Sequence, residues 1–320
     1  MWTLYTVLGI IAFLLALSIA SVAVIFFGTL HRTPKKNAAK KSAVDTTALN
    51  DLDFLAPYRE ACKKETAWFE SLGPRDVSME ADDGVTLHAE VLETENALAT
   101  VLLMHGFLTS PKHDFSLVFR FYREKGFNIV APYQRALGKS GGSYVTFGDK
   151  ERYDCKRWAE WIRDTYGESL PIVMDGVSMG ASTILMSIGT GLPKNVHAII
   201  ADCGYTTPWE IVCTVIKATK ILPIFPCAYI AKIFARVFGG FSFTKPSTIE
   251  AMKTCTLPIL FAHGKKDLFV PYEMSVRNFE ACASEKKTLF TVEEAGHGMC
   301  FLADREGYER EIEKLLKDIL

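Results

Sequence analysis

Short apolar segments alternate with helical patterns along most of the chain, and this alternation limits the possible folds more than any other feature. The apolar segments have the length of buried strands and end in turn residues: 100–104, 128–132, 172–175, 197–201, 257–262 and 288–292. The helical patterns lie at 115–125, 150–166, 181–189, 272–283 and 308–320. Such alternation is typical of a mostly parallel sheet covered on both faces. We therefore predict an α/β fold with a mostly parallel central sheet flanked by helices.

A hairpin is expected before this alternation begins. Residues 77–81 and 85–92 have the composition of strands, and Asp82-Asp83-Gly84 joins them. An Asp-Gly turn supplies the positive φ that a tight hairpin connection needs. The sheet should therefore begin with an antiparallel pair of strands.

The first 30 residues contain a long segment without charge. Between Trp2 and Leu30 there is no Asp, Glu, Lys or Arg. About 20 helical residues cross the roughly 30 Å hydrocarbon layer of a bilayer, so the segment is long enough to span it. The next charged residues are all basic: Arg32, Lys35, Lys36, Lys40 and Lys41. Because basic flanks stay on the cytoplasmic side, we expect a single-pass membrane protein whose bulk is cytoplasmic.

A cleaved signal peptide is the alternative interpretation of this segment. Signal peptides have a basic start, roughly 7–15 apolar residues and a small-residue cleavage site. Ser18-Ile19-Ala20 resembles a weak cleavage site, but no basic side chain precedes it and the apolar run continues through Phe27. An uncleaved anchor fits these features better.

Four parts are expected along the chain. They are a transmembrane anchor at 2–30, a basic tether at 31–50, a pre-domain helix at 51–73 and a globular domain at 74–320. Within the domain, residues 208–246 form an insertion whose apolar helices, 209–222 and 227–238, are separated by Pro223 and Pro226. The insertion carries five basic residues and one acidic residue. It fits a helical cap over the sheet and also a cap that rests on an anionic leaflet.

The net charge argues against binding of nucleic acid, and the cysteine spacing argues against a metal site. A formal net charge of −1 gives no chain-wide attraction to nucleic acid, which needs clustered Lys and Arg. The eight cysteines have no metal-type spacing, so no metal site is predicted. Several lie in apolar runs, where free thiols are expected rather than disulfides. The oligomeric state is not predicted.

Ser178 lies in the pattern Gly176-Val177-Ser178-Met179-Gly180, directly between a strand and a helix. The pattern alone is a weak signal. Its position between strand and helix is that of a nucleophile elbow, in which flanking glycines make room for a strained serine exposed above the sheet. We therefore predict that Ser178 is a nucleophile.

A serine nucleophile needs a base, and the base needs an acid that orients it. Asp267 follows the strand at 257–262, and His297 follows the strand at 288–292. We predict them as acid and base. Asp202, at the end of the strand at 197–201, is an alternative acid. Three other histidines do not complete a triad in this chain order: His105, His113 and His263.

With the order Ser178, Asp267, His297, the chain resembles an α/β-hydrolase. The resemblance covers about residues 74–320 and is strongest to bacterial membrane-tethered members related to the Bem46-like and serine aminopeptidase (monoacylglycerol-lipase-like) groups. It implies an α/β-hydrolase fold in which the insertion at 208–246 is a helical lid. The segment from Arg135 to Gly142 resembles the family's RxxGxSxG loop, with Gln134 where an acid often stands.

The resemblance also implies where an oxyanion would bind. His105-Gly106-Phe107 follows a strand and resembles the family's oxyanion loop. The backbone N–H groups of Phe107 and Met179 are then the expected donors. Such donors matter because removing one costs about 10²–10³ in turnover in a comparable hydrolase.

Together these features predict a serine hydrolase that cleaves small-molecule carboxylic esters through an acyl-Ser178 intermediate, without a metal or organic cofactor. An amide or peptide hydrolase and an acyltransferase would use the same triad. An alternative of another class is a noncatalytic, membrane-tethered binding module on the same scaffold. The natural substrate, its acyl-chain length and any contact of the lid with the bilayer are not predicted.

Overall fold

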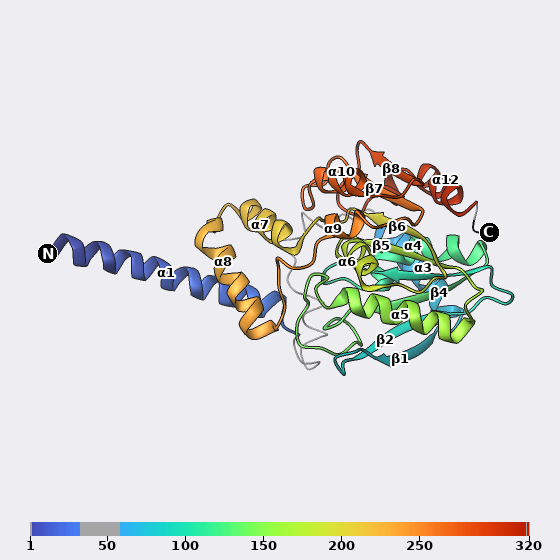
Figure 1. Cartoon of the computed structure of the whole chain (residues 1–320), viewed down its shortest axis with the longest axis horizontal. Helices are drawn as coiled ribbons and strands as arrows, with labels where there is room; N and C mark the ends of the chain where they lie inside the picture. The colour runs from blue at the N-terminus through green and yellow to red at the C-terminus, as the bar shows by residue number, and fades with distance from the viewer. Residues whose placement is uncertain (1, 33–57, 318, 320) are drawn as a thin grey trace.

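The computed structural model describes residues 2–32, 58–317 and 319, and an eight-stranded sheet lies at its centre (Figure 1). The strand order is β1-β2-β4-β3-β5-β6-β7-β8. The pairs β1·β2 and β2·β4 are antiparallel, and the others are parallel. The strands are β1 (Arg75–Glu80), β2 (Thr86–Leu92), β3 (Ala99–Met104), β4 (Phe127–Tyr133), β5 (Ile172–Val177), β6 (Val196–Asp202), β7 (Ile259–Gly264) and β8 (Lys287–Val292). The predicted hairpin and mostly parallel sheet are both confirmed.

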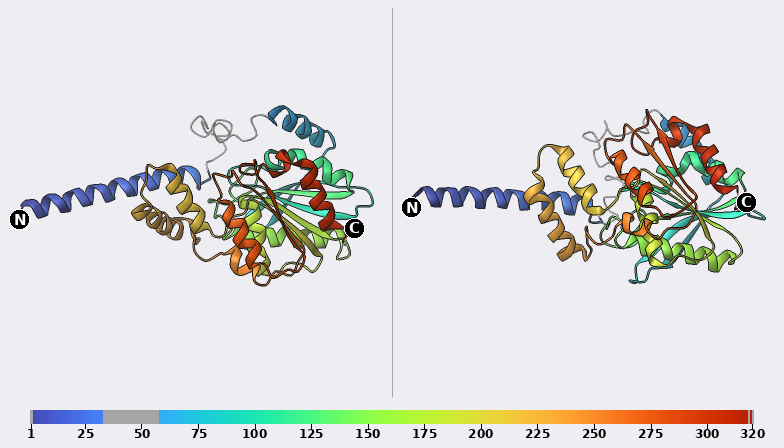
Figure 2. Two further views of the ribbon diagram at one scale, coloured as in Figure 1. Left: turned by 90° about the horizontal axis from the view of Figure 1, so that it is seen from above. Right: turned by 45° about the horizontal axis from the view of Figure 1, so that its top comes forward.

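Helices cover both faces of this sheet because side chains alternate along each strand. On β3, Val101 and Leu103 pack into one core layer, and Leu102 and Met104 into the other. The first layer contains side chains of α3 (Arg59–Ser71), α4 (Pro111–Glu124), α11 (Cys300–Ala303) and α12 (Arg305–Leu316). The second contains those of α5 (Glu151–Tyr166), α6 (Met179–Ser187), α9 (Thr248–Met252) and α10 (Tyr272–Ala281). Figure 2 shows the resulting three layers.

Some helix ends differ from those expected, and local capping explains the differences. α12 begins at Arg305 rather than 308, because the Asp304 carboxylate accepts a 2.9 Å hydrogen bond from the Gly307 N–H and caps the helix. In the insertion at 208–246, α7 (Pro208–Thr219) ends three residues before the expected 222. Lys220 is there in the left-handed conformation (φ +55°) that stops a helix. α8 (Ile224–Phe234) and a π-helical turn (Ala235–Gly239) follow.

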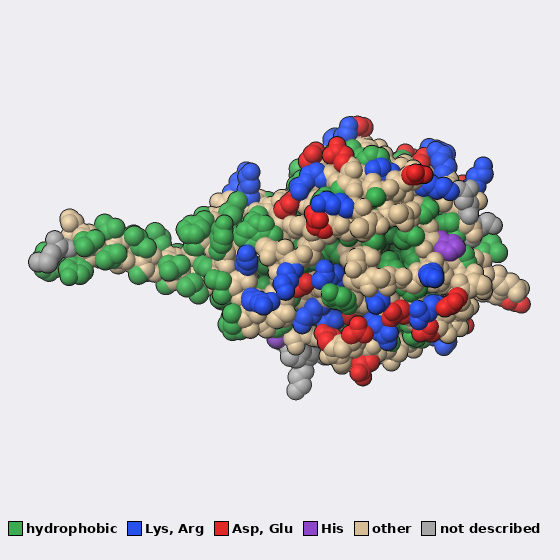
Figure 3. Space-filling view, in the orientation of Figure 1, with side chains coloured by type: hydrophobic (Ala, Val, Ile, Leu, Met, Phe, Trp, Pro, Cys, Tyr) green, Lys and Arg blue, Asp and Glu red, His purple; other side chains and the backbone are tan. Residues whose placement is uncertain are grey.

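The N-terminal helix α1 (Trp2–Thr29) is long and apolar enough to cross a membrane. Most of its 28 residues project away from the rest of the chain, and its C-terminal end packs against α8 (Figures 1 and 2). Figure 3 shows that hydrophobic side chains cover the projecting part and continue onto the neighbouring insertion helices. Lys, Arg, Asp and Glu are concentrated on the globular body instead.

The end of α1 is fixed to the loop that precedes α5. The Val145 N–H donates to the Leu30 carbonyl at 3.0 Å, and the Arg32 N–H donates to the Ser143 carbonyl at 2.8 Å. Of the predicted tether, residues 33–50 lie outside the described residues. Residues 51–57 of the predicted pre-domain helix also lie outside them, and α3 occupies most of the remainder. The eight cysteines, all within the described part, are free thiols.

The cap of α12 gives a test of local stability. Asp304→Ala removes the acceptor for the Gly307 N–H, so we expect the free energy of unfolding to fall by about 1 kcal/mol, which lowers Tm by about 2–4 °C in a domain of this size. Thermal unfolding in detergent, followed by circular dichroism, measures this change. Glu306→Ala, in the same helical turn, is the control and should shift Tm by less. Equal shifts would contradict the capping role.

Candidate active site

Ser178 lies on the turn between β5 and α6 with a positive φ of +55° and a ψ of −116°. Residues with a side chain seldom adopt this region, and the neighbouring glycines explain how the turn forms. A Cβ on Gly180 would lie 1.8 Å from the Met104 carbonyl oxygen, and one on Gly176 would lie 2.7 Å from the α6 backbone. The Ser178 N–H donates to the Asp202 carbonyl at 2.8 Å. The turn is therefore held at the carboxyl end of the sheet.

The three residues predicted as a triad meet above this end of the sheet. The Nε2 atom of His297 is 2.9 Å from the Ser178 Oγ, and its Nδ1 atom is 2.7 Å from the Asp267 Oδ2. Each residue stands in a loop after a parallel strand: Ser178 after β5, Asp267 after β7 and His297 after β8. Ser178 is only 6% exposed, and the His297 side chain 15%. The site is thus nearly closed to solvent, and Ser178 lines a pocket.

Asp267 accepts four hydrogen bonds, which fix the orientation of its carboxylate. Its Oδ1 accepts from the backbone N–H groups of Phe269 and Val270, both at 2.8 Å. Its Oδ2 accepts from His297 and also from the Nε2 of buried His263 at 3.1 Å. Burial alone would raise the pKa of Asp267, but the hydrogen bonds from the two histidines lower it well below its usual range. Asp267 therefore stays ionised.

The tautomer of His263 follows from its neighbours. Its Nε2 also lies 3.0 Å from the Val270 carbonyl, so the proton is on Nε2, and Nδ1 accepts from the Ser275 hydroxyl at 2.7 Å. Sequence reasoning left the role of His263 open because it completes no triad. Its position at the end of β7, four residues before Asp267, is the signal that could have revealed this contact.

Asp202, the alternative acid, does not take the orienting position. It ends β6, and its Oδ1 has no hydrogen-bond partner within the described residues. Burial raises the pKa of Asp202 to about 6, although the nearby His263 and His297 oppose that shift. The His297 Nδ1–H donates its hydrogen bond to Asp267 instead. The structure thus assigns different environments to the two carboxylates.

The loop His105-Gly106-Phe107 follows β3 and is held by a buried carboxylate that the sequence did not reveal. Oδ2 of Asp114, on α4, accepts from the Gly106 N–H and from the Thr109 hydroxyl, both at 2.7 Å. The Phe107 and Met179 amides make no hydrogen bond to any other group in the described part of the chain. Both residues line the same pocket as Ser178. They offer the pair of unused donors that an oxyanion site requires.

Gln134, where the resemblance places an acid, connects this loop to α6. Its backbone N–H donates to the His105 Nε2 at 3.0 Å, and its side-chain amide donates to the His105 carbonyl. Its Oε1 accepts from the Thr183 hydroxyl at 3.4 Å. A carboxylate could not donate the hydrogen bond to the His105 carbonyl. Gln134 therefore has a structural role that the sequence pattern did not predict.

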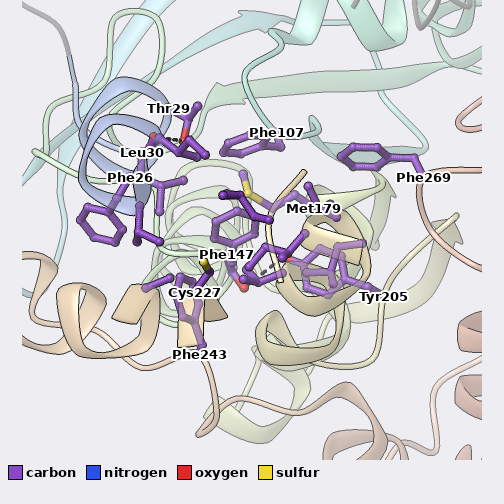
Figure 4. A pocket seen from close by; sticks show the side chains of 18 of the residues that line it. Phe26, Thr29, Leu30, Phe107, Phe147, Met179, Tyr205, Cys227, Phe243 and Phe269 are labelled. Carbon is purple, nitrogen blue, oxygen red and sulfur yellow. Dashed lines mark hydrogen bonds between the residues drawn. The ribbon is translucent and has the colours of Figure 1, made fainter. Parts of the chain in front are cut away.

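A mostly apolar pocket of about 200 Å³ opens at Ser178. Figure 4 shows Phe107, Phe147 and Met179 around its centre, with Tyr205 and Phe269 on one side. The Phe107 and Phe147 rings stack with centroids 5.0 Å apart. α7 and α8 supply a second wall, and the end of α1 supplies a third. The pocket suits an apolar group whose reactive carbon lies against the Ser178 Oγ.

One group of side chains among the described residues has the spacing of metal ligands. It consists of Cys203, Asp267 and His297, whose ligand atoms lie within 4.8 Å of one another. Asp267 and His297 already share a hydrogen bond, and burial raises the pKa of the Cys203 thiol well above its usual value. The donor set is thus explained by the hydrogen-bonded triad, and we assign it no metal.

Two curated proteins illustrate the relatives of the chain. YqkD of Bacillus subtilis, an uncharacterised protein, is 25% identical over 220 residues, which cover 69% of this chain and 72% of YqkD. The bem46 protein of Schizosaccharomyces pombe is 24% identical over 256 residues, which cover 77% of this chain and 79% of bem46. No protein-family model matches the chain.

Solved structures show the same architecture. The esterase Pf2001 of Pyrococcus furiosus has a TM-score of 0.64 and 25% identity, over 78% of this chain and 92% of the esterase. Mouse α/β-hydrolase domain-containing protein 10 has a TM-score of 0.55 and 19% identity, over 77% of this chain and all of that chain (100%). The parallel sheet, the flanking helices and these neighbours agree with the resemblance found in the sequence. The chain has the fold of the α/β-hydrolases.

Proposed function

We propose that the chain is a serine hydrolase that cleaves carboxylic esters through an acyl-serine intermediate. The observation that carries this proposal is the continuous row of hydrogen bonds from Asp267 through His297 to the Ser178 Oγ, at 2.7 and 2.9 Å. A base within 3 Å of a hydroxyl and oriented by an ionised carboxylate is the arrangement that activates serine. The esterase Pf2001, with its similar fold, supports hydrolysis of esters in particular.

In the first half of the reaction, the Ser178 Oγ attacks the ester carbonyl carbon while the His297 Nε2 accepts the hydroxyl proton. The carbonyl oxygen gains negative charge, which the unused Phe107 and Met179 amides stabilise. Asp267 stabilises the imidazolium that forms without taking its proton. The C–O bond to the alcohol then breaks, and His297 returns the proton to the departing alcohol. An acyl group remains on Ser178.

In the second half, water replaces the alcohol. His297 removes a proton from water, and the resulting hydroxide adds to the acyl carbon at the same oxyanion site. The bond to the Ser178 Oγ breaks, His297 reprotonates the serine, and the carboxylic acid leaves. Every proton is returned within the cycle, so the triad needs neither a metal nor an organic cofactor.

We also propose that α1 is an uncleaved single-pass anchor and that the catalytic domain lies on the cytoplasmic side. The 28-residue apolar helix and the basic residues that follow it support this topology. The hydrogen bonds that join Leu30 to Val145 and Arg32 to Ser143 are a second support, because they integrate the end of this segment into the folded protein. A signal peptide is removed from the mature protein, so it would have no reason to pack against the folded domain in this way.

The assignment of Ser178 is tested with a fluorophosphonate, which reacts covalently with activated serines. We expect the detergent-solubilised full chain to be labelled and to hydrolyse p-nitrophenyl acetate. Ser178→Ala should lose labelling and lower turnover by about 10⁶-fold or to background, because no other group replaces the nucleophile. Ser182→Ala is the matched control on α6 and should keep labelling. A wild-type chain that is folded but neither labelled nor active would instead indicate the noncatalytic binding module.

The two candidate acids are separated by matched substitutions. Asp267→Asn keeps the size of the side chain but reverses the preferred His297 tautomer, so we expect kcat to fall by about 10³–10⁴-fold. Asp202→Asn should change kcat by less than about tenfold, because Asp202 does not orient His297. Steady-state kinetics with p-nitrophenyl acetate measures both. A larger loss in Asp202→Asn than in Asp267→Asn would reverse the assignment.

Protease protection tests the topology. In a bacterial host, we expect externally added trypsin to leave the catalytic domain intact in sealed spheroplasts and to degrade it in inverted membrane vesicles, because basic flanks stay in the cytoplasm. An immunoblot with an antibody against the catalytic domain shows whether the domain is intact in the spheroplasts and in the vesicles. The mass of the membrane-bound chain should correspond to all 320 residues. Degradation in spheroplasts, or a secreted chain that begins near residue 21, would contradict the topology.

A further inference from the structure

The C-terminal end of α1 is part of the pocket that opens at Ser178. Four residues of α1 line this pocket, and so does Leu30 directly after the helix; the four are Val22, Ile25, Phe26 and Thr29. Figure 4 shows Phe26, Thr29 and Leu30 along one side of the cavity, facing Phe107 and Phe147. The helix predicted as a membrane anchor therefore also forms a wall of the candidate active site.

The C-terminal end of α1, which forms this wall, packs tightly against the rest of the protein. Phe26 is 3% exposed, and its ring packs against Tyr144 and against Phe234 of α8, with centroids 5.8 Å apart in each case. Val22 and Leu30 are also buried. Two backbone hydrogen bonds fix the end of the helix: one joins residues 30 and 145, and the other joins residues 32 and 143. The position of α1 next to the pocket is thus determined by packing and by hydrogen bonds.

The length of α1 places the pocket relative to a membrane. About 20 residues cross the roughly 30 Å hydrocarbon layer. α1 has 28 residues, and the residues from Trp2 to Ala20 are almost all exposed, whereas buried positions begin at Val22. The exposed part has the length of a span. The packed part therefore begins where the helix leaves the hydrocarbon, and the pocket lies at the membrane surface.

The outer face of α7, α8, their connecting segment and the π-helical turn after α8 fits the same location. Large apolar side chains are exposed there: Ile221 (83%), Phe225 (75%), Ile233 (59%) and Val237 (66%). Basic residues stand among them: Lys217, Lys220, Lys232 and Arg236. Exposed apolar groups mixed with Lys and Arg are typical of helices in the interface of an anionic bilayer. In Figure 3 this apolar surface continues that of α1.

The pocket has an apolar side next to the anchor. Ile25 and Thr29 line the cavity, yet both are exposed, so the wall formed by α1 borders the surroundings of the helix as well as the pocket. The other lining groups are mostly aliphatic or aromatic, and the described residues provide no charged side chain there. A hydrocarbon chain that leaves the bilayer along α1 reaches Ser178 without crossing water.

We propose that this pocket binds the acyl chain of a membrane ester lipid, which enters from the bilayer along α1, with α1 as one wall of the acyl site. The inference rests on the proposed function, since it names the substrate class of the same serine. A long acyl chain is its occupant because the pocket is apolar, lies at the end of the transmembrane segment and ends at the nucleophile.

A pair of substitutions on α1 tests the wall. Ile25→Trp adds bulk at an exposed position that lines the pocket, and Val24→Trp adds the same bulk at a position that is 75% exposed and does not line it. The full chain is reconstituted in phosphatidylcholine–phosphatidylglycerol vesicles, and kcat/KM is measured for p-nitrophenyl laurate and p-nitrophenyl acetate. We expect Ile25→Trp to lower the laurate-to-acetate ratio about tenfold or more, and Val24→Trp to change it by less than about twofold.

Comparison of the laurate and acetate esters distinguishes two outcomes: the acyl site along α1 is wrong, or the proposed serine hydrolase itself is wrong. Acetate turnover and fluorophosphonate labelling depend on the triad, so both should persist in Val24→Trp, whose side chain does not line the pocket. If they persist and the laurate-to-acetate ratio changes equally in both variants, the acyl site along α1 is wrong while the serine hydrolase stands. If the wild type shows no labelling and no acetate turnover, the proposed function itself is wrong.

Covalent trapping locates the chain directly. A dodecyl fluorophosphonate with a diazirine at the end of its alkyl chain is first attached to Ser178 in vesicles and then photolysed. Mass spectrometry of the digested protein should find the crosslink on the α1 segment that contains Val22 to Leu30. Crosslinks confined to the β-sheet loops or to α10 would overturn the proposed path. Ser178→Ala, which cannot hold the probe, gives the background.

Discussion

Ser178 adopts a backbone conformation with a positive φ because β5 must turn into α6 within one residue, directly against β3. Such a conformation costs on the order of 1–3 kcal/mol for a residue with a side chain and persists only where the surroundings over-determine it. Here β5 is paired on both sides, α6 is buried throughout, and the Ser178 N–H is bound to the Asp202 carbonyl. The position of the Oγ therefore follows from the core of the sheet, and the base, the acid and the pocket are arranged around it.

The acid side of the site shows the same dependence on fixed neighbours. Asp267 receives hydrogen bonds from His263, His297 and two backbone amides, so its carboxylate has little freedom to rotate. His263 is in turn fixed by Ser275 on α10. This second layer of contacts holds His297 within hydrogen-bond distance of Ser178 before any substrate arrives. Preorganisation of this kind limits the reorganisation that the reaction requires.

The sequence was sufficient to predict the features that depend on local pattern. Ser178, Asp267 and His297 could be found because each stands in a loop after a strand, and the carboxyl ends of parallel strands meet at one edge. The ends of α7 and α12 were misplaced, because they depend on a left-handed Lys220 and on a cap by Asp304 that periodicity does not encode. Asp114 and Gln134 were missed for another reason. Their partners lie on other segments, and ordinary polar residues in a loop or helix carry no pattern that identifies those partners.

The packing of the end of α1 beside the pocket could not be predicted either, because the same apolar residues suit lipid and protein neighbours equally. This ambiguity also has an energetic consequence. In water, separating α1 from α8 would expose apolar surface at about 25 cal/mol per Å². At the proposed membrane location an acyl chain would replace the contact, and lipid tails are as apolar as the side chains they would displace, so little hydrophobic free energy would oppose the exchange. The contact between α1 and α8 is therefore the part of the pocket wall that a lipid chain can open at the smallest cost, whereas the sheet that holds Ser178 remains fixed.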